Sequence, residues 1–327
     1  MRRIGAKTAL LFLPAAGAFA LLSIRSADAS AAAQAGLETC LRTVIPALFP
    51  FLVMTNLLLR LELPSIIRES LGTAFEALFN IRKAALPAFL AGLVGGYPLG
   101  AEAAAECRRL GRCSGEEAER LAIIANNCSP GFLFGLVSRK LPGGGECVLI
   151  LLLLQWLISS FLGVVLGAGH RPSIVAADKG DAFKPSFSSM FSTAVRSGGR
   201  SVLCICAYVV FFSVFTAFLP DSAFLKGVVE LTGGILALPS GPQGEILAAF
   251  LVGFGGLSVA CQVLSSLEGT DIPTGRYLPL RLLHGLLMAF GMFSLKLGRV
   301  YLLLYAALLV SIAVLVKTYG KRANSGV

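Results

Sequence analysis

The sequence predicts an all-α polytopic membrane protein: an inverted repeat with two re-entrant helical hairpins and about seven membrane-crossing helices. Composition predicts the membrane location, because 56% of the residues are hydrophobic, 14% are charged and the mean hydropathy is +0.80, more apolar than a soluble core requires. A repeated motif predicts the symmetry, because residues 88–92 (AFLAG) recur 161 positions later as 249–253 (AFLVG). Duplicated membrane units with a helix-breaking centre are typical of transporters.

The repeat extends beyond this pentapeptide. Arg120 and Arg281 stand 28 residues beyond the shared glycines, and each is followed by leucine and an apolar segment. The offset predicts four parts of the chain. They are an N-terminal transmembrane helix and loop at 1–42, a first repeat at 43–169, a polar cytoplasmic linker at 170–200 and a second, inverted repeat at 201–327.

Five apolar runs have the 17–25 residues, roughly, that a helix needs to cross a bilayer. They lie at 8–24, 43–59, 147–168, 201–219 and 299–317. Three further apolar regions, at 84–101, 121–138 and 244–295, are broken by Gly, Pro or Asn. A broken backbone at membrane depth faces protein or a water-filled cavity.

The first run follows Arg2, Arg3 and Lys7, so residues 1–29 also fit a secretory signal peptide with an A-x-A cleavage site at 27–29. The length of the run and the position of Arg25 favour a first transmembrane helix. We therefore place the N-terminus in the cytoplasm.

The charges between the spans then set the topology. Segment 60–83 is basic and amphipathic, as expected of an interfacial helix on the inner side, whereas its counterpart at 221–242 has lost the positive bias. This difference predicts that the second repeat is inverted. The same topology places Lys317, Lys321 and Arg322 outside, although Lys and Arg are normally in excess on the cytoplasmic side.

The broken regions predict two hairpins. The first spans 84–113 with its tip at 95–100, and the second spans 244–270 with its tip at 253–258. The helix at 116–138 is interrupted at 126–131, and the helix at 277–297 is interrupted around His284 and Gly285.

Substrate-binding candidates lie at the hairpin tips, because the ends of half-helices meet near the midplane of inverted-repeat transporters. Glycine permits close backbone approach, and Tyr97 and Ser258 offer hydroxyl groups. Tight helix packing is the alternative role of the glycines. The candidates are Gly95, Gly96, Tyr97, Pro98, Gly100, Gly255, Gly256, Ser258 and Gln262.

Asn126, Asn127 and Ser129 are further substrate-binding candidates, because polar groups inside an apolar span are costly unless partnered. Their alternative role is to satisfy the carbonyls freed by Pro130.

Glu102, Glu106 and His284 are candidates for coupling to a cation, a proton or sodium. The alternatives are pairing of the glutamates with Arg108, Arg109 or Arg120, and packing of the histidine. Arg120 and Arg281 fit an anionic ligand or interfacial snorkelling.

Several function classes are excluded. The net charge of +10 is scattered between spans, which excludes nucleic-acid binding. The eight cysteines form no CxxC pair, so we expect structural thiols, no metal site and no cofactor. The chain lacks a nucleophile elbow, a P-loop, a dinucleotide fingerprint and HExxH, which argues against an enzyme. The sequence is compatible with a homo-oligomer in the lipid bilayer.

Four motifs resemble the YlbJ family of sporulation integral membrane proteins. They are 95–101 (GGYPLGA), 117–121 (EAERL), 126–132 (NNCSPGF) and 253–259 (GFGGLSV) with Gln262. The resemblance implies a nucleoside-recognition (Gate) domain similar to the core of concentrative nucleoside transporters. It also implies export of dipicolinic acid across the mother-cell-derived membrane around the forespore.

The expected function is transport of a small organic anion by alternating access, with dipicolinic acid as the substrate. A nucleoside carrier and a non-transporting membrane scaffold are the alternatives. A carrier requires Asn126, Asn127, Ser129, Gln262 and His284 to converge on a wet cavity, whereas a scaffold buries them in pairs.

Overall fold

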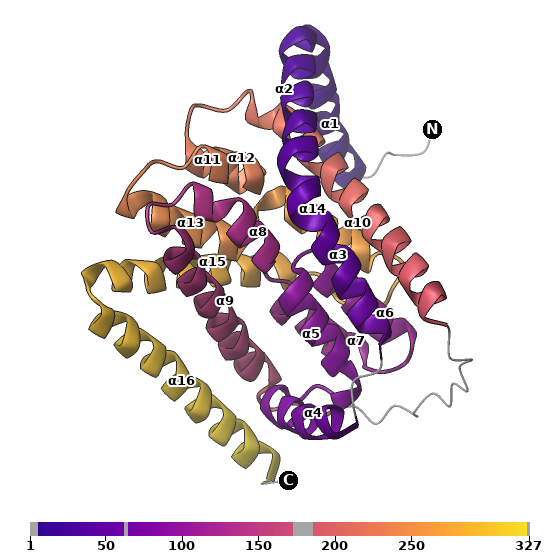
Figure 1. The fold of residues 1–327 in the computed structure, drawn as a ribbon, viewed down its shortest axis with the longest axis vertical. Helices are drawn as coiled ribbons and strands as arrows, with labels where there is room; N and C mark the ends of the chain where they lie inside the picture. Colours follow the sequence, from indigo (N-terminus) through magenta and orange to yellow (C-terminus); the bar gives the residue numbers. More distant parts are fainter. Residues whose placement is uncertain (1–5, 62–64, 173–185, 326–327) are drawn as a thin grey trace.

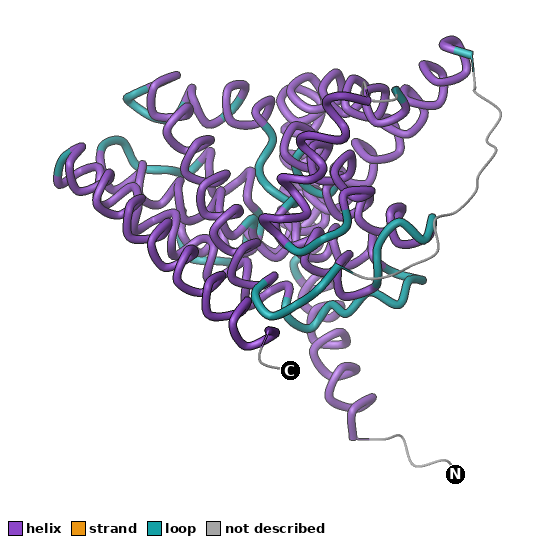
Figure 2. Tube along the Cα trace, turned by 90° about the horizontal axis from the view of Figure 1, so that it is seen from below, coloured by secondary structure: helices purple, strands orange, loops and turns teal. Residues whose placement is uncertain are grey.

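The computed structural model describes residues 6–61, 65–172 and 186–325, and every regular element in that part of the chain is a helix (Figures 1 and 2). The predicted all-α class is confirmed. Within these described ranges, six helices can cross a membrane by length and composition: Ser26–Leu57, Gly144–Gly167, Phe187–Thr216, Pro242–Leu267, Tyr277–Leu297 and Arg299–Gly320. The bent pair Glu69–Phe79 and Lys83–Gly95 brings the number to seven.

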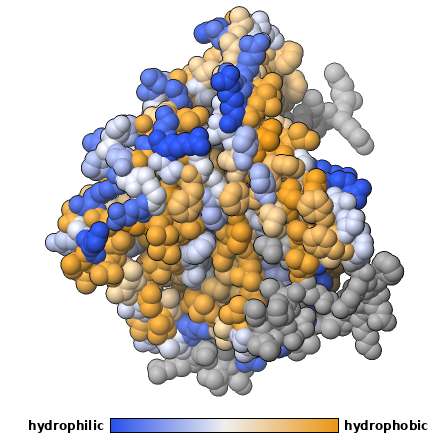
Figure 3. All heavy atoms as spheres, viewed as in Figure 1, coloured by the Kyte–Doolittle hydropathy of each residue, from blue (hydrophilic) through white to orange (hydrophobic). Residues whose placement is uncertain are grey.

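Hydrophobic side chains cover the middle of the face over α3, α9 and α16, and hydrophilic residues gather toward its upper edge (Figure 3). This distribution is expected of helices that contact lipid. It agrees with the predicted location in a membrane.

The N-terminal helices differ from the prediction in length. Helix α1 (Ala6–Ile24) turns at Arg25 into α2 (Ser26–Thr39), which runs through a π-turn, η1 (Cys40–Val44), into α3 (Ile45–Arg60). The predicted span at 43–59 therefore begins at Ser26. Only residues 12–24 of α1 count as a short apolar helix. Residues 1–5 of the predicted signal segment lie outside the described residues.

The first half contains the predicted hairpin and the predicted break. Helix α4 (Ser65–Phe79) leads through η2 (Lys83–Ala85) at a bend of 111° into α5 (Leu86–Gly95), which packs against α6 (Leu99–Arg109). Helix α7 (Gly115–Ile124) stops before α8 (Pro130–Gly135), as predicted. The half ends with η3 (Val137–Arg139) and α9 (Gly144–Gly167).

The second half begins earlier than predicted. Helix α10 (Phe187–Thr216) starts within the predicted linker, whose residues 173–185 lie outside the described residues. Two short helices, α11 (Ala223–Val229) and α12 (Leu231–Leu236), are followed by α13 (Pro242–Phe254), α14 (Gly256–Leu267), α15 (Tyr277–Leu297) and α16 (Arg299–Ser325). Helix α15 lacks the predicted interruption at His284, because this stretch holds no internal breaker stronger than glycine.

The prediction of a second re-entrant hairpin at 244–270 is wrong. Helices α13 and α14 form one 26-residue span that is broken only at Gly255. Glu245 in the first turn of α13 contacts Lys296 at the end of α15, whereas Asp271 beyond α14 contacts Arg108 at the foot of α6. No proline stops the chain here, so the helix resumes after one residue and continues across.

This crossing reverses the last two helices. Helix α16 runs parallel to α9, since Arg299 pairs with Glu146 at one end and Gly320 lies against Ala168 at the other. By contrast, α3 and α10 are antiparallel, as the predicted inversion requires: Arg60 meets Ser197 and Cys40 meets the carbonyl of Cys206. The inversion therefore holds for α3 and α10 and fails for α9 and α16.

The reversal also moves the C-terminal lysine. Lys317 donates a 2.5 Å hydrogen bond to the carbonyl of Leu78 on α4, so α16 ends beside the basic segment and not across the membrane from it. The side chains of Lys321 and Arg322 lie outside the described residues. The basic end, as we call it, is the end of the molecule with Arg60, Arg82, Lys83, Arg108, Arg112, Arg200 and Lys317.

Candidate functional site

Four breaks in the helices meet in the middle of the molecule. They are the α5–α6 tip at 96–98, the α7–α8 break at 125–129, Glu230 between α11 and α12, and Gly255 between α13 and α14. The backbone N–H of Tyr97 donates to the carbonyl of Asn127 at 2.8 Å, and a Cβ on Gly255 would lie 3.9 Å from the Tyr97 ring. The two predicted tips therefore meet, as the carrier hypothesis expects.

The tip glycines bring backbones together. A Cβ on Gly96 would lie 2.5 Å from the backbone nitrogen of Ser129, and Gly96 has a φ of 74°. A Cβ on Gly100 would collide with the carbonyl of Ala125. Close packing, the alternative considered for these glycines, describes Gly96 and Gly100 in this structure.

The two asparagines lie in the α7–α8 break and are fully buried. The Asn126 amide donates to the Tyr277 hydroxyl at 2.6 Å. The Asn127 amide donates to the carbonyl of Ile124 at 2.9 Å, and its oxygen accepts from the Ser159 hydroxyl at 2.7 Å. Helix α9 thus holds the break through a side chain, and neither asparagine lines the large or the small cavity described below.

Two residues of α9 complete this network. The Gln155 amide brackets Cys128, accepting from its backbone N–H at 3.2 Å and donating to its carbonyl at 2.9 Å. The Ser159 hydroxyl lies 3.2 Å from Nε2 of His284. Asn127 and His284 are therefore buried in pairs, the arrangement expected of a scaffold. Gln155 and Ser159 were missed, although a lone amide within the apolar run of 148–158 was a signal.

A large cavity of about 610 Å³ opens at the basic end between α3, α6, α10 and α14. Its volume falls within the range of about 300–1,000 Å³ that holds small ligands. Polar and charged side chains line it: Asn56, Arg60, Glu102, Glu106, Arg109, Arg112, Ser197, Arg200, Ser201 and Ser266.

The charges in this cavity do not balance. Glu106 pairs with Arg109 at 3.0 Å, and Glu102 accepts from the Ser201 hydroxyl at 3.2 Å. Among the residues that the structure describes, neither Arg112 nor Arg200 forms an ion pair. The two coupling candidates thus lie in a cavity with excess positive charge, and one of them has the arginine partner that was the alternative.

A small cavity of about 30 Å³ lies where the breaks meet. Four predicted residues, Tyr97, Ser129, Ser258 and Gln262, line it together with Glu230. The Ser129 hydroxyl accepts from the backbone N–H of Phe132 and caps α8. Glu230 was missed, because it was interpreted as a topology charge. Its position after an apolar turn and before Leu-Thr-Gly-Gly was the available signal.

The two repeat-related arginines are buried and do not snorkel. Arg120 donates to the carbonyl of Asn80 at 3.0 Å and is 2% exposed. Arg281 is 1% exposed, and its Nε and Nη1 have no hydrogen-bond partner in the described part of the chain. A buried guanidinium without an acid is costly unless a ligand supplies the anion.

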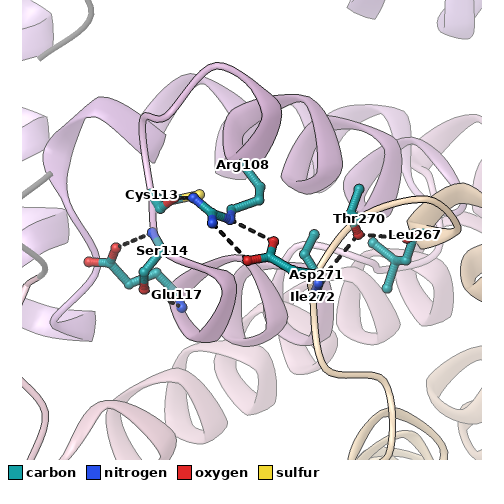
Figure 4. A network of polar contacts seen from close by, with 8 residues as sticks. All are labelled: Arg108, Cys113, Ser114, Glu117, Leu267, Thr270, Asp271 and Ile272. Atoms are coloured by element: carbon teal, nitrogen blue, oxygen red, sulfur yellow. Dashed lines mark hydrogen bonds and ion pairs between the residues drawn. The ribbon is translucent and has the colours of Figure 1, made fainter. Parts of the chain in front are cut away.

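Two ion pairs join the halves at the basic end. Arg108 holds both carboxylate oxygens of Asp271, each at 2.7 Å, and reaches the carbonyl of Cys113 (Figure 4). This pairing holds the pKa of Asp271 below its usual range. Arg276 pairs in the same two-pronged manner with Glu119, which is 2% exposed.

Comparison with known proteins finds one relative of note. The chain is 25% identical to the sporulation integral membrane protein YlbJ of Bacillus subtilis (strain 168), over 79% of this chain and 75% of that protein. No family model and no solved structure matches the chain. The resemblance predicted from the four motifs is confirmed, and the nucleoside-recognition (Gate) assignment stays a prediction. The relative also supports the predicted integral membrane location.

Proposed function

Because the chain is a relative of the sporulation integral membrane protein YlbJ, we propose that it carries a small organic anion across a membrane during sporulation. The observation that supports this proposal is the 610 Å³ cavity, in which Arg112 and Arg200 form no ion pair with any described residue. Guanidinium groups bind carboxylates in two-pronged pairs, so the cavity suits a mono- or dicarboxylate. We take dipicolinic acid, a planar dicarboxylate, as the substrate implied by the sequence resemblance.

Arg281 gives a second reason to expect an anion. It lies between the chain breaks, is 1% exposed and keeps two guanidinium nitrogens, Nε and Nη1, without a hydrogen-bond partner in the described part of the chain. A carboxylate there would satisfy both groups and offset the buried charge. Alternating access would then expose this central position to one side and then the other.

Proteoliposome uptake of labelled dipicolinate, with a labelled nucleoside in parallel, tests the proposal. We expect saturable dipicolinate flux and a KM at least tenfold higher in Arg200→Gln. Arg299→Gln is the matched control, because Arg299 is exposed on the opposite end and pairs with Glu146. Arg281→Gln should abolish flux while leaving the protein folded. Flux of the nucleoside without flux of dipicolinate would contradict anion transport and support the alternative, a nucleoside carrier.

The pairwise burial of Asn127 and His284 favours one other function, a non-transporting scaffold. A scaffold needs no unpaired arginine in its cavity. Absence of flux for either substrate under proton, sodium and voltage gradients would favour this alternative.

A further inference from the structure

The small cavity has the features of an ion site that is separate from the large one. About 30 Å³ exceeds the roughly 10–15 Å³ that one water requires and is far below the volume of an organic anion. Its polar lining comes from three of the helix breaks, at Tyr97, Ser129 and Glu230, and from α14 just beyond the fourth break, and α3 and α10 complete the wall. Any species bound here would therefore contact both halves of the chain.

Glu230 supplies the charge of this site. It is 2% exposed, and its carboxylate accepts from the backbone N–H groups of Thr232 at 2.9 Å and Gly233 at 2.6 Å. Within the described residues, no lysine, arginine or histidine forms an ion pair with it. A buried carboxylate without a countercharge is costly, and two amide donors only partly offset that cost.

Two neighbours supply free oxygens. Ser258 is 1% exposed, and its hydroxyl has no hydrogen-bond partner in the part of the chain that the structure describes. Gln262, one turn further along α14, is 3% exposed, and its side-chain amide forms no hydrogen bond there either. Buried polar groups normally find partners, so two open ones on the same cavity indicate a missing ligand.

We propose that this cavity binds one monovalent cation of about the size of sodium. The carboxylate of Glu230, the hydroxyl of Ser258 and the amide oxygen of Gln262 would be its ligands, since hard cations prefer oxygen donors. One carboxylate balances one positive charge, whereas a divalent ion would leave an excess charge in a buried site. The bound cation would hold the broken helices of both halves together.

Thermal unfolding of the full chain in nanodiscs tests this site without any substrate. The fluorescence of Trp156, the single tryptophan, reports unfolding while sodium replaces choline at constant ionic strength. We expect a saturable rise in Tm for the natural protein. Ser258→Ala should raise the sodium midpoint at least tenfold, and Glu230→Gln should remove the saturable response.

Glu146→Gln is the matched control, because it removes an exposed carboxylate that pairs with Arg299 and lines neither cavity. Its sodium response should equal that of the natural protein. Should Glu230→Gln fail to fold, Ser258→Ala decides alone, since it leaves the bonds of Glu230 to Thr232 and Gly233 intact. A natural protein insensitive to sodium, or one whose Tm responds to pH instead, overturns the proposal. An unchanged midpoint in Ser258→Ala also overturns it. None of these outcomes bears on anion transport.

Discussion

The break between α7 and α8 and the unbroken α15 occupy equivalent places in the two halves, 161 residues apart. In the first half, Ser129 caps a new helix that starts at Pro130, and Asn127 bonds to the carbonyl of Ile124. The equivalents of residues 126–131 are 287–292, which read LMAFGM and contain no proline, amide or hydroxyl. One half therefore carries the polar groups that terminate and restart a helix, and the other half packs against it.

The α5–α6 hairpin and the α13–α14 span show the same difference. Pro98 removes a donor at the turn of the hairpin, whereas Val259 stands at the equivalent position and lets α14 continue. Tyr97 and Ser258 are also equivalent, and both line the small cavity. The presence or absence of proline at the turn thus decides whether the chain turns back or crosses the membrane. The position before it, Tyr97 or Ser258, lies at the small cavity in both halves.

The largest expected effect concerns the side on which α16 ends. Cysteines introduced at Lys83 and Lys317, in a background without the exposed Cys204, should react with an impermeant maleimide from the same side of a vesicle. A cysteine at Lys226, beyond the opposite end of α10, should react only from the other side. If Lys317→Cys reacts from the same side as Lys226→Cys, then α13 and α14 form a re-entrant hairpin after all, and the two halves do not differ at this point.

Gly96→Ala should destabilise the hairpin tip. Its φ of 74° disfavours a side chain by about 1–3 kcal/mol, and the new Cβ would meet the backbone nitrogen of Ser129. Leu257→Ala, at the equivalent position of the other half, changes an exposed side chain on a continuing helix. Thermal unfolding measures both. Equal losses of Tm would show that the two breaks are built alike.

Asn127→Leu should cost about 1–3 kcal/mol for each buried group that loses its partner, because the carbonyl of Ile124 loses its donor and the Ser159 hydroxyl loses its acceptor and keeps only His284. Met288→Leu at the equivalent position of α15 conserves volume and should cost less than about 1.5 kcal/mol. Denaturant unfolding of the two variants measures the contrast. A smaller loss for Asn127→Leu would mean that α9 does not hold the break.

The smallest expected effect lies in the exposed pair between Arg108 and Asp271. Because the pairing lowers the pKa of Asp271, its contribution to stability is complete above the ordinary aspartate range and is lost as the pH falls through the lowered value. Asp271→Asn should remove this part of the acid dependence of Tm. The same profile in Glu268→Gln, a nearby glutamate without an ion pair in the described residues, serves as the reference.

Sequence patterns predict the helical class, most spans, the first hairpin and the α7–α8 break, because length, hydropathy and proline positions are local signals. They do not predict the direction of α14, which depends on Val259 standing where the other half has proline. Tyr97, Ser129, Ser258 and Gln262 could be assigned to one site from their polarity inside apolar segments. The burial of Glu230 and the grouping of Arg112 with Arg200 depend on tertiary packing, which no local signal contains.

The position of the large cavity at the basic end has an electrical consequence. The positive-inside rule predicts that this end faces the cytoplasm, so an anion would enter from the compartment that is negative relative to the outside. Outward movement of each negative charge is then favoured by an electrical free energy of about 2.3 kcal/mol for every 100 mV of membrane potential. A dicarboxylate leaving from this side would be driven by voltage alone, and its release would run faster in an energised membrane than in a depolarised one.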